Sequence, residues 1–204
     1  MTLTELCQKH SFKPDGILHV GAAMLEEAEE YRDLGVKTVI WVEALPGDEE
    51  RRERAKLFGH ELHELLPLSD ENNDIILKVT TNTFSSSILP LKRHYELYPE
   101  VTVEREIKTM SRRADGYFTT FPKEINTLVL DVQGAELKVL RGMGQLIYQF
   151  QWCLVETFLT ELYEGCALKP ELDRWMRDRG FQNAEYIPVL EGEWGDTLYR
   201  REFK

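Results

Sequence analysis

The chain has 204 residues, of which 42% are hydrophobic and 30% are charged, a composition that predicts one folded domain over residues 1–204. Its formal charge of −11 repels polyanions, so we expect no nucleic-acid partner. No apolar run approaches the roughly 20 residues that cross a bilayer, and the N-terminus has no signal-peptide core. We therefore expect no membrane partner, a cytoplasmic location, and reduced thiols at Cys7, Cys153 and Cys166.

In the first half of the chain, short apolar runs alternate with segments of helical pattern. Runs rich in β-branched and aromatic residues are typical of buried strands, and a proline fits the first turn of a helix. We expect strands over residues 16–22, 38–44 and 60–66, and helices over residues 26–34 and 46–58. Residues 74–80 and 101–109 predict two extra strands that frame a polar loop.

The same alternation returns in the second half. Strands are expected over residues 127–132 and 152–158, with a helix after Gly134 whose apolar positions Leu137, Leu140 and Met143 share one face. A helix over residues 170–180 follows, and strands over residues 181–189 and 197–203 close the chain as a hairpin. Apolar strands that alternate with helices predict an α/β fold, with a mostly parallel sheet covered on both faces and an antiparallel last strand.

Three of the predicted strands end in residues that suit a ligand. Open parallel sheets bind ligands beyond the carboxyl ends of their strands. The small residues Gly21 and Ala22 let a ligand approach the backbone closely, and the helix start that follows offers free N–H groups. Glu43 lies 22 residues after Gly21, a spacing at which an acidic residue accepts hydrogen bonds from a ribose diol. Together with Asp131 at a third strand end, this pattern predicts a site for an adenosine-containing ligand.

Longer motifs resemble a known family. The chain contains His19-Val-Gly-Ala22 with Glu27 and Tyr31, Trp41-Val-Glu-Ala44 with Pro46, Leu68-Ser-Asp70, Ser85-Ser-Ser87, Asp131-Val-Gln-Gly134 with Glu136, Glu161-Leu-Tyr-Glu-Gly-Cys166, and Trp194-Gly-Asp-Thr-Leu-Tyr199. These motifs, spread over roughly residues 16–200, resemble the FkbM-type methyltransferases. The resemblance implies a Rossmann-like class I methyltransferase fold with a seven-stranded sheet and an extra β insertion. It also implies S-adenosylmethionine as the methyl donor and O-methylation of a hydroxyl on a sugar or secondary metabolite.

The resemblance further assigns roles to individual residues. It implies that the donor's methionine part lies near Gly21 and Ala22, its ribose on Glu43, and its adenine beside the Leu68-Ser-Asp70 segment. The serines at positions 85–87 either close over the donor or cap a polar loop. The full set implied for donor binding is His19, Gly21, Ala22, Glu27, Glu43, Ala44, Leu68, Ser69, Asp70, Ser86, Asp131 and Gln133.

Two positions depart from the family pattern. Leu25 stands where the family usually has glycine, which narrows the room near the donor's carboxylate. Ser111, in Thr109-Met-Ser111, stands where an aspartate is common, so an acidic group is missing. These departures motivate an alternative function, a catalytically weak or inactive methyltransferase-like domain that binds the cofactor or a partner protein.

Methyl transfer to an alcohol needs a base within hydrogen-bond reach of the hydroxyl proton. Asp131 is our first candidate for this base. Alternatively, Asp131 caps the helix that follows or binds the donor. Glu136 and His94 follow as catalytic candidates, although Glu136 also suits a helix dipole and His94 has the polar neighbours of a surface histidine. We assign no metal ligands; Asp131 and Glu156 together would suit magnesium, but no spacing requires it.

Other segments point to structure or to the acceptor. The mixed charges of residues 49–54 predict a solvated helix face, and the two histidines within residues 60–64 lack zinc-motif spacing. Tyr163 and Trp194 lie in predicted loops from which they could reach a small-molecule acceptor. The chain has no Gly-x-Gly-x-x-Gly and no Asp-x-Asp, which argues against a nicotinamide-dependent oxidoreductase and a metal-dependent glycosyltransferase. The sequence leaves open whether the protein forms a homo-oligomer.

Overall fold

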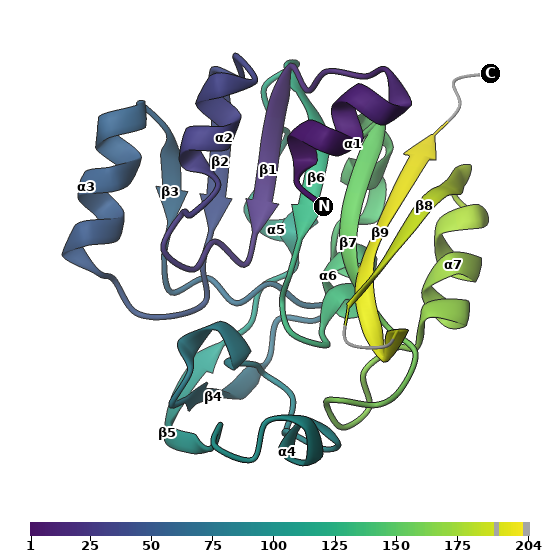
Figure 1. Ribbon diagram of the computed structural model, residues 1–204. Coiled ribbons are helices and arrows are strands. Elements are labelled where there is room, and N and C mark those ends of the chain that lie inside the picture. Colours follow the sequence, from purple (N-terminus) through teal and green to yellow (C-terminus); the bar gives the residue numbers. More distant parts are fainter. Residues whose placement is uncertain (190–191, 202–204) are drawn as a thin grey trace.

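The computed structural model describes residues 1–189 and 192–201. Seven strands form one sheet in the order β3-β2-β1-β6-β7-β9-β8 (Figure 1). They are β1 (Gly16–Val20), β2 (Thr38–Val42), β3 (Glu61–His63), β6 (Ile125–Leu130), β7 (Trp152–Phe158), β8 (Phe181–Val189) and β9 (Trp194–Arg201). Strands β3, β2, β1, β6 and β7 pair in parallel, whereas β9 is antiparallel to both β7 and β8. The predicted Rossmann-like methyltransferase sheet, with its antiparallel last strand, is confirmed.

Helices cover both faces of this sheet. One face packs against α1 (Leu3–His10), α2 (Ala28–Asp33) and α3 (Glu49–Phe58), and the other against α6 (Glu136–Gly142), the 3-10 helix η2 (Gly144–Gln149) and α7 (Lys169–Arg177), with α5 (Ala114–Tyr117) beside them. Because side chains alternate along a strand, Ile17 of β1 joins the first core and Leu18 the second. The strands are buried from both sides, which explains their near-continuous apolar sequence.

A smaller unit lies beyond the carboxyl ends of the parallel strands, at the bottom of Figure 1. It consists of the antiparallel pair β4 (Asp74–Thr80) and β5 (Val103–Met110), joined by a segment that contains the 3-10 helix η1 (Thr83–Ser85) and α4 (His94–Leu97). This is the predicted β insertion, and we call residues 74–110 the insertion from here on. Its position places it directly over the strand ends that the sequence marks as a ligand site.

Several helix boundaries differ from the predicted ones. Helix α3 begins at Glu49 rather than at Pro46, because the Asp48 carboxylate caps it by accepting the N–H of Arg51 at 3.2 Å. Helix α2 begins at Ala28 rather than at position 26, because the turn before it is left-handed at Ala23 and Leu25. Helix α7 ends at Arg177, short of the predicted end at position 180.

Strand boundaries differ mainly at the sheet edges. The predicted strand over residues 60–66 shrinks to β3, and Leu65, with φ at 56°, bends the chain away. Strand β6 stops at Leu130, which leaves Asp131 in the turn that follows. Strands β4, β7 and β8 have the predicted bounds. The predicted last strand begins earlier, at Trp194, and its expected end at Phe203 lies outside the described residues.

Helix α1 was not predicted, although the sequence carried its signal. The Thr2 hydroxyl accepts the N–H of Glu5 at 3.2 Å, and the Glu5 carboxylate accepts the N–H of Thr2 at 2.8 Å. This capping box is the Thr-x-x-Glu pattern that marks a helix start. Across the described residues, no helix combines the length and apolar character needed to span a membrane. The three cysteines are buried and free, as expected.

Candidate functional site

A cavity of about 760 Å³ lies between the carboxyl ends of the parallel strands and the insertion. Its volume falls within the range of small-molecule sites in proteins. The ends of β1, β2, β6 and β7 form one wall, and residues 77–105 of the insertion form much of the other. The predicted site residues that line it are Gly21, Glu43, Ala44, Leu68, Ser86, His94, Asp131 and Gln133.

Gly21 brings the ends of β1 and β6 together. Its φ is +92°, and a Cβ atom there would lie 1.6 Å from the carbonyl oxygen of Asp131. Only glycine fits this position, because any side chain would collide with the neighbouring backbone. The same approach places Asp131 beside the turn that we predicted to receive the ligand.

The turn after Gly21 is held by two charged residues from the next βα unit. The Glu43 carboxylate accepts the N–H of Ala23 at 2.7 Å and that of Leu45 at 2.8 Å. Arg51 donates from Nε to the carbonyl of Ala23 at 2.5 Å. Ala23 and Leu25 both have positive φ, at 43° and 59°. Non-glycine residues persist in that region when their surroundings fix them, and Glu43 and Arg51 supply the restraint.

Neither departure from the family pattern reaches the cavity. The Leu25 side chain is fully buried in the core beneath α2, so it does not narrow the cavity as expected. Its carbonyl instead accepts a hydrogen bond from Arg54 at 2.9 Å. Ser111 is buried as well, and its hydroxyl donates to the carbonyl of Glu71 at 2.8 Å. Both residues belong to the scaffold.

Arg51 corrects the expectation that residues 49–54 form only a solvated face. Its side chain is 4% exposed, lines the cavity, and pairs with Glu64 at 2.9 Å. Glu64 also pairs with the exposed Arg52 at 2.7 Å. Residues 49–54 mix acidic and basic side chains, and the sequence pattern alone does not show which arginine turns inward. The capped start of α3 at Asp48 sets that orientation.

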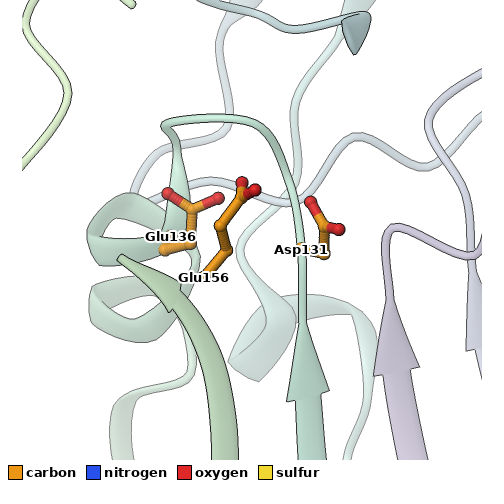
Figure 2. A group of neighbouring side chains, drawn as sticks. All are labelled: Asp131, Glu136 and Glu156. Atoms are coloured by element: carbon orange, nitrogen blue, oxygen red, sulfur yellow. The ribbon is translucent and has the colours of Figure 1, made fainter. Parts of the chain in front are cut away.

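Three carboxyl groups gather beyond the end of β6 (Figure 2). One oxygen from each of Asp131, Glu136 and Glu156 lies within 4.8 Å of the others. Asp131 is open to the cavity, whereas Glu136 and Glu156 are buried. Burial raises the pKa of both glutamates well above the usual carboxyl range, and the neighbouring carboxylates raise it further. The cluster therefore retains protons that isolated carboxyl groups would lose at neutral pH.

Glu136 was a catalytic candidate, but its carboxylate serves the backbone. One oxygen accepts the N–H of Val132 at 3.0 Å and that of Gly134 at 3.1 Å. The residue does not line the cavity. Its position in the first turn of α6 lets it close the loop between β6 and α6, which is the helix-start role that the sequence also allowed.

His19 also lies behind the cavity wall rather than in it. Its Nδ1 is 2.9 Å from the Tyr31 hydroxyl, and its ring packs 4.8 Å from that of Trp41. Burial lowers the pKa of His19 to about 3, so the ring is neutral. The histidine and tyrosine of the first motif thus join β1 to α2. The other predicted residues that do not line the cavity are Ala22, Glu27, Ser69 and Asp70.

His94 lies in the insertion and is buried, not a surface histidine. Its Nε2 is 3.1 Å from the Ser85 hydroxyl, and burial lowers its pKa. Its ring packs beside those of Tyr98 and Tyr163, at 5.1 and 5.5 Å. Tyr163 and Trp194 also line the cavity, and Trp194 begins β9 rather than lying in the predicted loop. Sequence analysis missed Tyr98, because a tyrosine between two polar runs carries no distinct signal.

Comparisons with known proteins support this architecture. The chain is 30% identical to the methyltransferase sdnD of Sordaria araneosa over 97 residues. That match covers 43% of this chain and 36% of the curated relative, so the chain spans little more than a third of its length.

Solved structures share the fold at low identity. One is an uncharacterized protein from Listeria monocytogenes serotype 4b, 9% identical with a TM-score of 0.53, covering 100% of this chain and 70% of that one. Another is a protein of the NADB-Rossmann superfamily from Streptococcus agalactiae, 10% identical with a TM-score of 0.50, covering 100% and 71%. The model of the methyltransferase FkbM domain matches residues 17–182, and the chain therefore belongs to that family.

Proposed function

We propose that this protein transfers a methyl group from S-adenosylmethionine to a hydroxyl of a small acceptor, a sugar or a secondary metabolite. The observation that carries the proposal is the placement of Glu43 and Asp131, which end different strands and face one cavity. An acidic residue at each position suits the two tasks of the reaction, holding a ribose and accepting a proton.

The residues at the strand ends fit an adenosyl donor. Each oxygen of Glu43 accepts one backbone N–H, so each retains a lone pair for a ribose hydroxyl. Leu66, Pro67 and Leu68 supply an apolar wall beside it, which suits the flat face of adenine. Gly21 leaves the backbone open to the donor's amino-acid part.

Asp131 is the residue that we assign to the acceptor's proton. When bound, S-adenosylmethionine supplies a methyl group on a positively charged sulfur and departs as neutral S-adenosylhomocysteine. Asp131 accepts the hydroxyl proton while the acceptor oxygen bonds to the methyl carbon and the carbon–sulfur bond breaks. The carboxylate is open to the cavity, and residues of the insertion form the wall opposite it.

The non-catalytic alternative draws no support from the site. It was motivated by Leu25 and Ser111, and both lie outside the cavity lining. Glu43 and Asp131, to which we assign the ribose and the proton, both face the cavity. We therefore keep catalysis as the conclusion.

Calorimetric titration with S-adenosylmethionine tests donor binding. Replacement Glu43→Gln should weaken binding by about 1 to 3 kcal/mol, because a charged hydrogen-bond acceptor is lost. Glu53→Gln, an exposed change on α3, is the matched control and should leave affinity unchanged. If the unmodified protein does not bind the donor at all, the proposed function is wrong.

Transfer of a radiolabelled methyl group to a panel of uncharged hydroxylated acceptors tests the base. With an acceptor that supports turnover, Asp131→Asn should lower kcat by about 100-fold or more and keep donor affinity within about twofold. Retained turnover in this variant would move the base to another residue.

A further inference from the structure

Gln133, two residues after Asp131, connects several parts of the site. Its side-chain amide donates to Asp131 Oδ1 at 2.6 Å and to Glu156 Oε2 at 3.0 Å. Its side-chain oxygen accepts from the Tyr163 hydroxyl at 2.5 Å, and its backbone carbonyl accepts from the Ser87 hydroxyl at 2.7 Å. One residue thus bonds to the end of β6, to β7, to the loop after β7 and to the insertion.

The amide orientation is determined by its partners. Asp131 and Glu156 offer acceptor oxygens, and the Tyr163 hydroxyl offers a proton. Only an amide with its nitrogen toward the carboxyl groups and its oxygen toward Tyr163 satisfies all three. A carboxylate at this position would lack the N–H donors that Gln133 offers to Asp131 and Glu156.

The backbone at Gln133 adopts a strained conformation that supports the side-chain contacts of this residue. Gln133 has φ at 56°, and Gly134 follows with φ at 96°. A Cβ atom on Gly134 would lie 2.8 Å from the Cβ of Tyr163, so the tyrosine packs directly against this turn. Left-handed conformations of non-glycine residues are rare and persist where the surroundings determine them. The strained turn is what aims the Gln133 side chain between the two carboxyl groups.

The same contacts secure one segment of the insertion. Tyr163 donates from its hydroxyl to the carbonyl of Ser85 as well, at 3.3 Å. Ser87 pairs with Lys78 of β4 through two backbone hydrogen bonds, at 2.8 and 3.1 Å. Residues 85–87, which line the cavity, are therefore tied to β4 on one side and to Gln133 and Tyr163 on the other.

We infer that Gln133 is a positioning residue that orients the Asp131 carboxylate and, through the same turn, holds residues 85–87 closed over the cavity. The inference rests on the proposed function, in which Asp131 accepts the proton. It predicts that loss of the amide both loosens the insertion and changes the surroundings of the buried Glu156.

Two substitutions separate the contacts of the amide. Gln133→Met keeps the length of the side chain and removes every side-chain hydrogen bond. Gln133→Glu keeps an acceptor for Tyr163 but removes the donor to Asp131 and Glu156. Gln145→Met, an exposed change in η2, is the matched control.

Two measurements on the full chain test the effects of these substitutions. Amide hydrogen exchange at residues 85–87 should rise about three- to tenfold in Gln133→Met, because Tyr163, which also contacts Ser85, loses its hydrogen bond to the Gln133 side chain. Exchange at residues 85–87 should rise less in Gln133→Glu. The infrared carboxyl band of Glu156, identified as the band that Glu156→Gln removes, should shift in both variants. Gln145→Met should change neither.

Unchanged exchange and an unchanged band in Gln133→Met would overturn the inference. If that variant does not fold, Tyr163→Phe removes a single hydroxyl and should still raise exchange at residues 85–87; no rise there would also overturn it. Titration of the same samples with S-adenosylhomocysteine reports on the proposed function separately. A protein that does not bind this ligand refutes the donor site, whereas the exchange and infrared results decide the role of Gln133.

Discussion

The two walls of the cavity are built in different ways. The strand-end wall belongs to the main core, since every residue of β1 is buried and Gly21 touches the backbone of Asp131. The insertion wall rests on a two-stranded sheet, and most residues of β5 are exposed. A two-stranded sheet alone is marginally stable in water. The insertion therefore depends on its attachments to the rest of the molecule.

This difference suggests how the site divides its work. Under the proposed function, the strand-end wall holds the donor and needs exact placement of a few groups, which the densely packed core provides. The insertion wall would admit the acceptor, and a segment attached by a small number of hydrogen bonds opens at a lower cost than the whole fold. Local stability should consequently differ between the walls, and three experiments examine that difference.

The largest effect should come from Gly21→Ala in the strand-end wall. The added Cβ would lie 1.6 Å from the Asp131 oxygen, and the backbone is left-handed at this position. We expect a loss of about 3 to 5 kcal/mol in unfolding free energy, measured by urea denaturation. Gly59→Ala is the control, since φ is +69° there but no atom lies within 4 Å. It should cost about 1 kcal/mol. Similar losses in both variants would show that steric closeness at Gly21 is unimportant.

A smaller effect should appear in the pH dependence of stability. Burial raises the pKa of Glu136 in the folded state, so the native protein holds a proton that the unfolded chain releases above about pH 4.5. Stability is then fully present below that pH and falls as pH rises toward the folded pKa. Glu136→Gln removes this titration and keeps an oxygen for the N–H groups of Val132 and Gly134. Between pH 5 and pH 8 the variant should lose about 1 to 2 kcal/mol less than the unmodified protein.

Urea denaturation across this pH range measures the slope. Glu53→Gln, exposed on α3, is the control and should follow the unmodified protein at every pH. A Glu136→Gln curve parallel to that of the unmodified protein would mean that Glu136 is not protonated in the fold.

The smallest effect on global stability should come from Ser87→Ala in the insertion. The change removes the hydrogen bond to the Gln133 carbonyl and one that the Ser87 hydroxyl accepts from the N–H of Leu89. We expect a loss of about 1 kcal/mol or less in the free energy of global unfolding, together with faster amide exchange in β4 and residues 85–87. Exchange in β1 and β6 should stay unchanged. Equal acceleration in the main sheet would mean that the two walls open together.

The main sheet was predictable because its strands are buried on both faces. Runs such as that of β2 carry β-branched and aromatic residues without interruption. Most of the errors lie where local and tertiary signals compete. Pro46 suggested a helix start, but the Asp48 cap determines it, and Pro46 lines the cavity instead. Helix α1 was missed although its capping box is local.

The site was predictable only in part. Glu43 and Asp131 follow from strand ends and spacing, and both face the cavity. The burial of Arg51 depends on a partner at Glu64, and the aim of Gln133 depends on a left-handed turn. Its partners Tyr163 and Ser87 lie 30 and 46 positions away in the sequence. Such contacts arise from the folded chain, and no local pattern encodes them.

The close approach of Gly21 to Asp131 has a consequence for engineering acceptor specificity. Because a Cβ atom at position 21 would meet the backbone carbonyl of Asp131, Gly21 does not tolerate the size changes by which a binding pocket is usually reshaped. Phe84 of the insertion, which is exposed and lines the cavity, carries no such constraint. A mutagenesis library aimed at new acceptors should therefore vary positions such as Phe84 and leave Gly21 fixed.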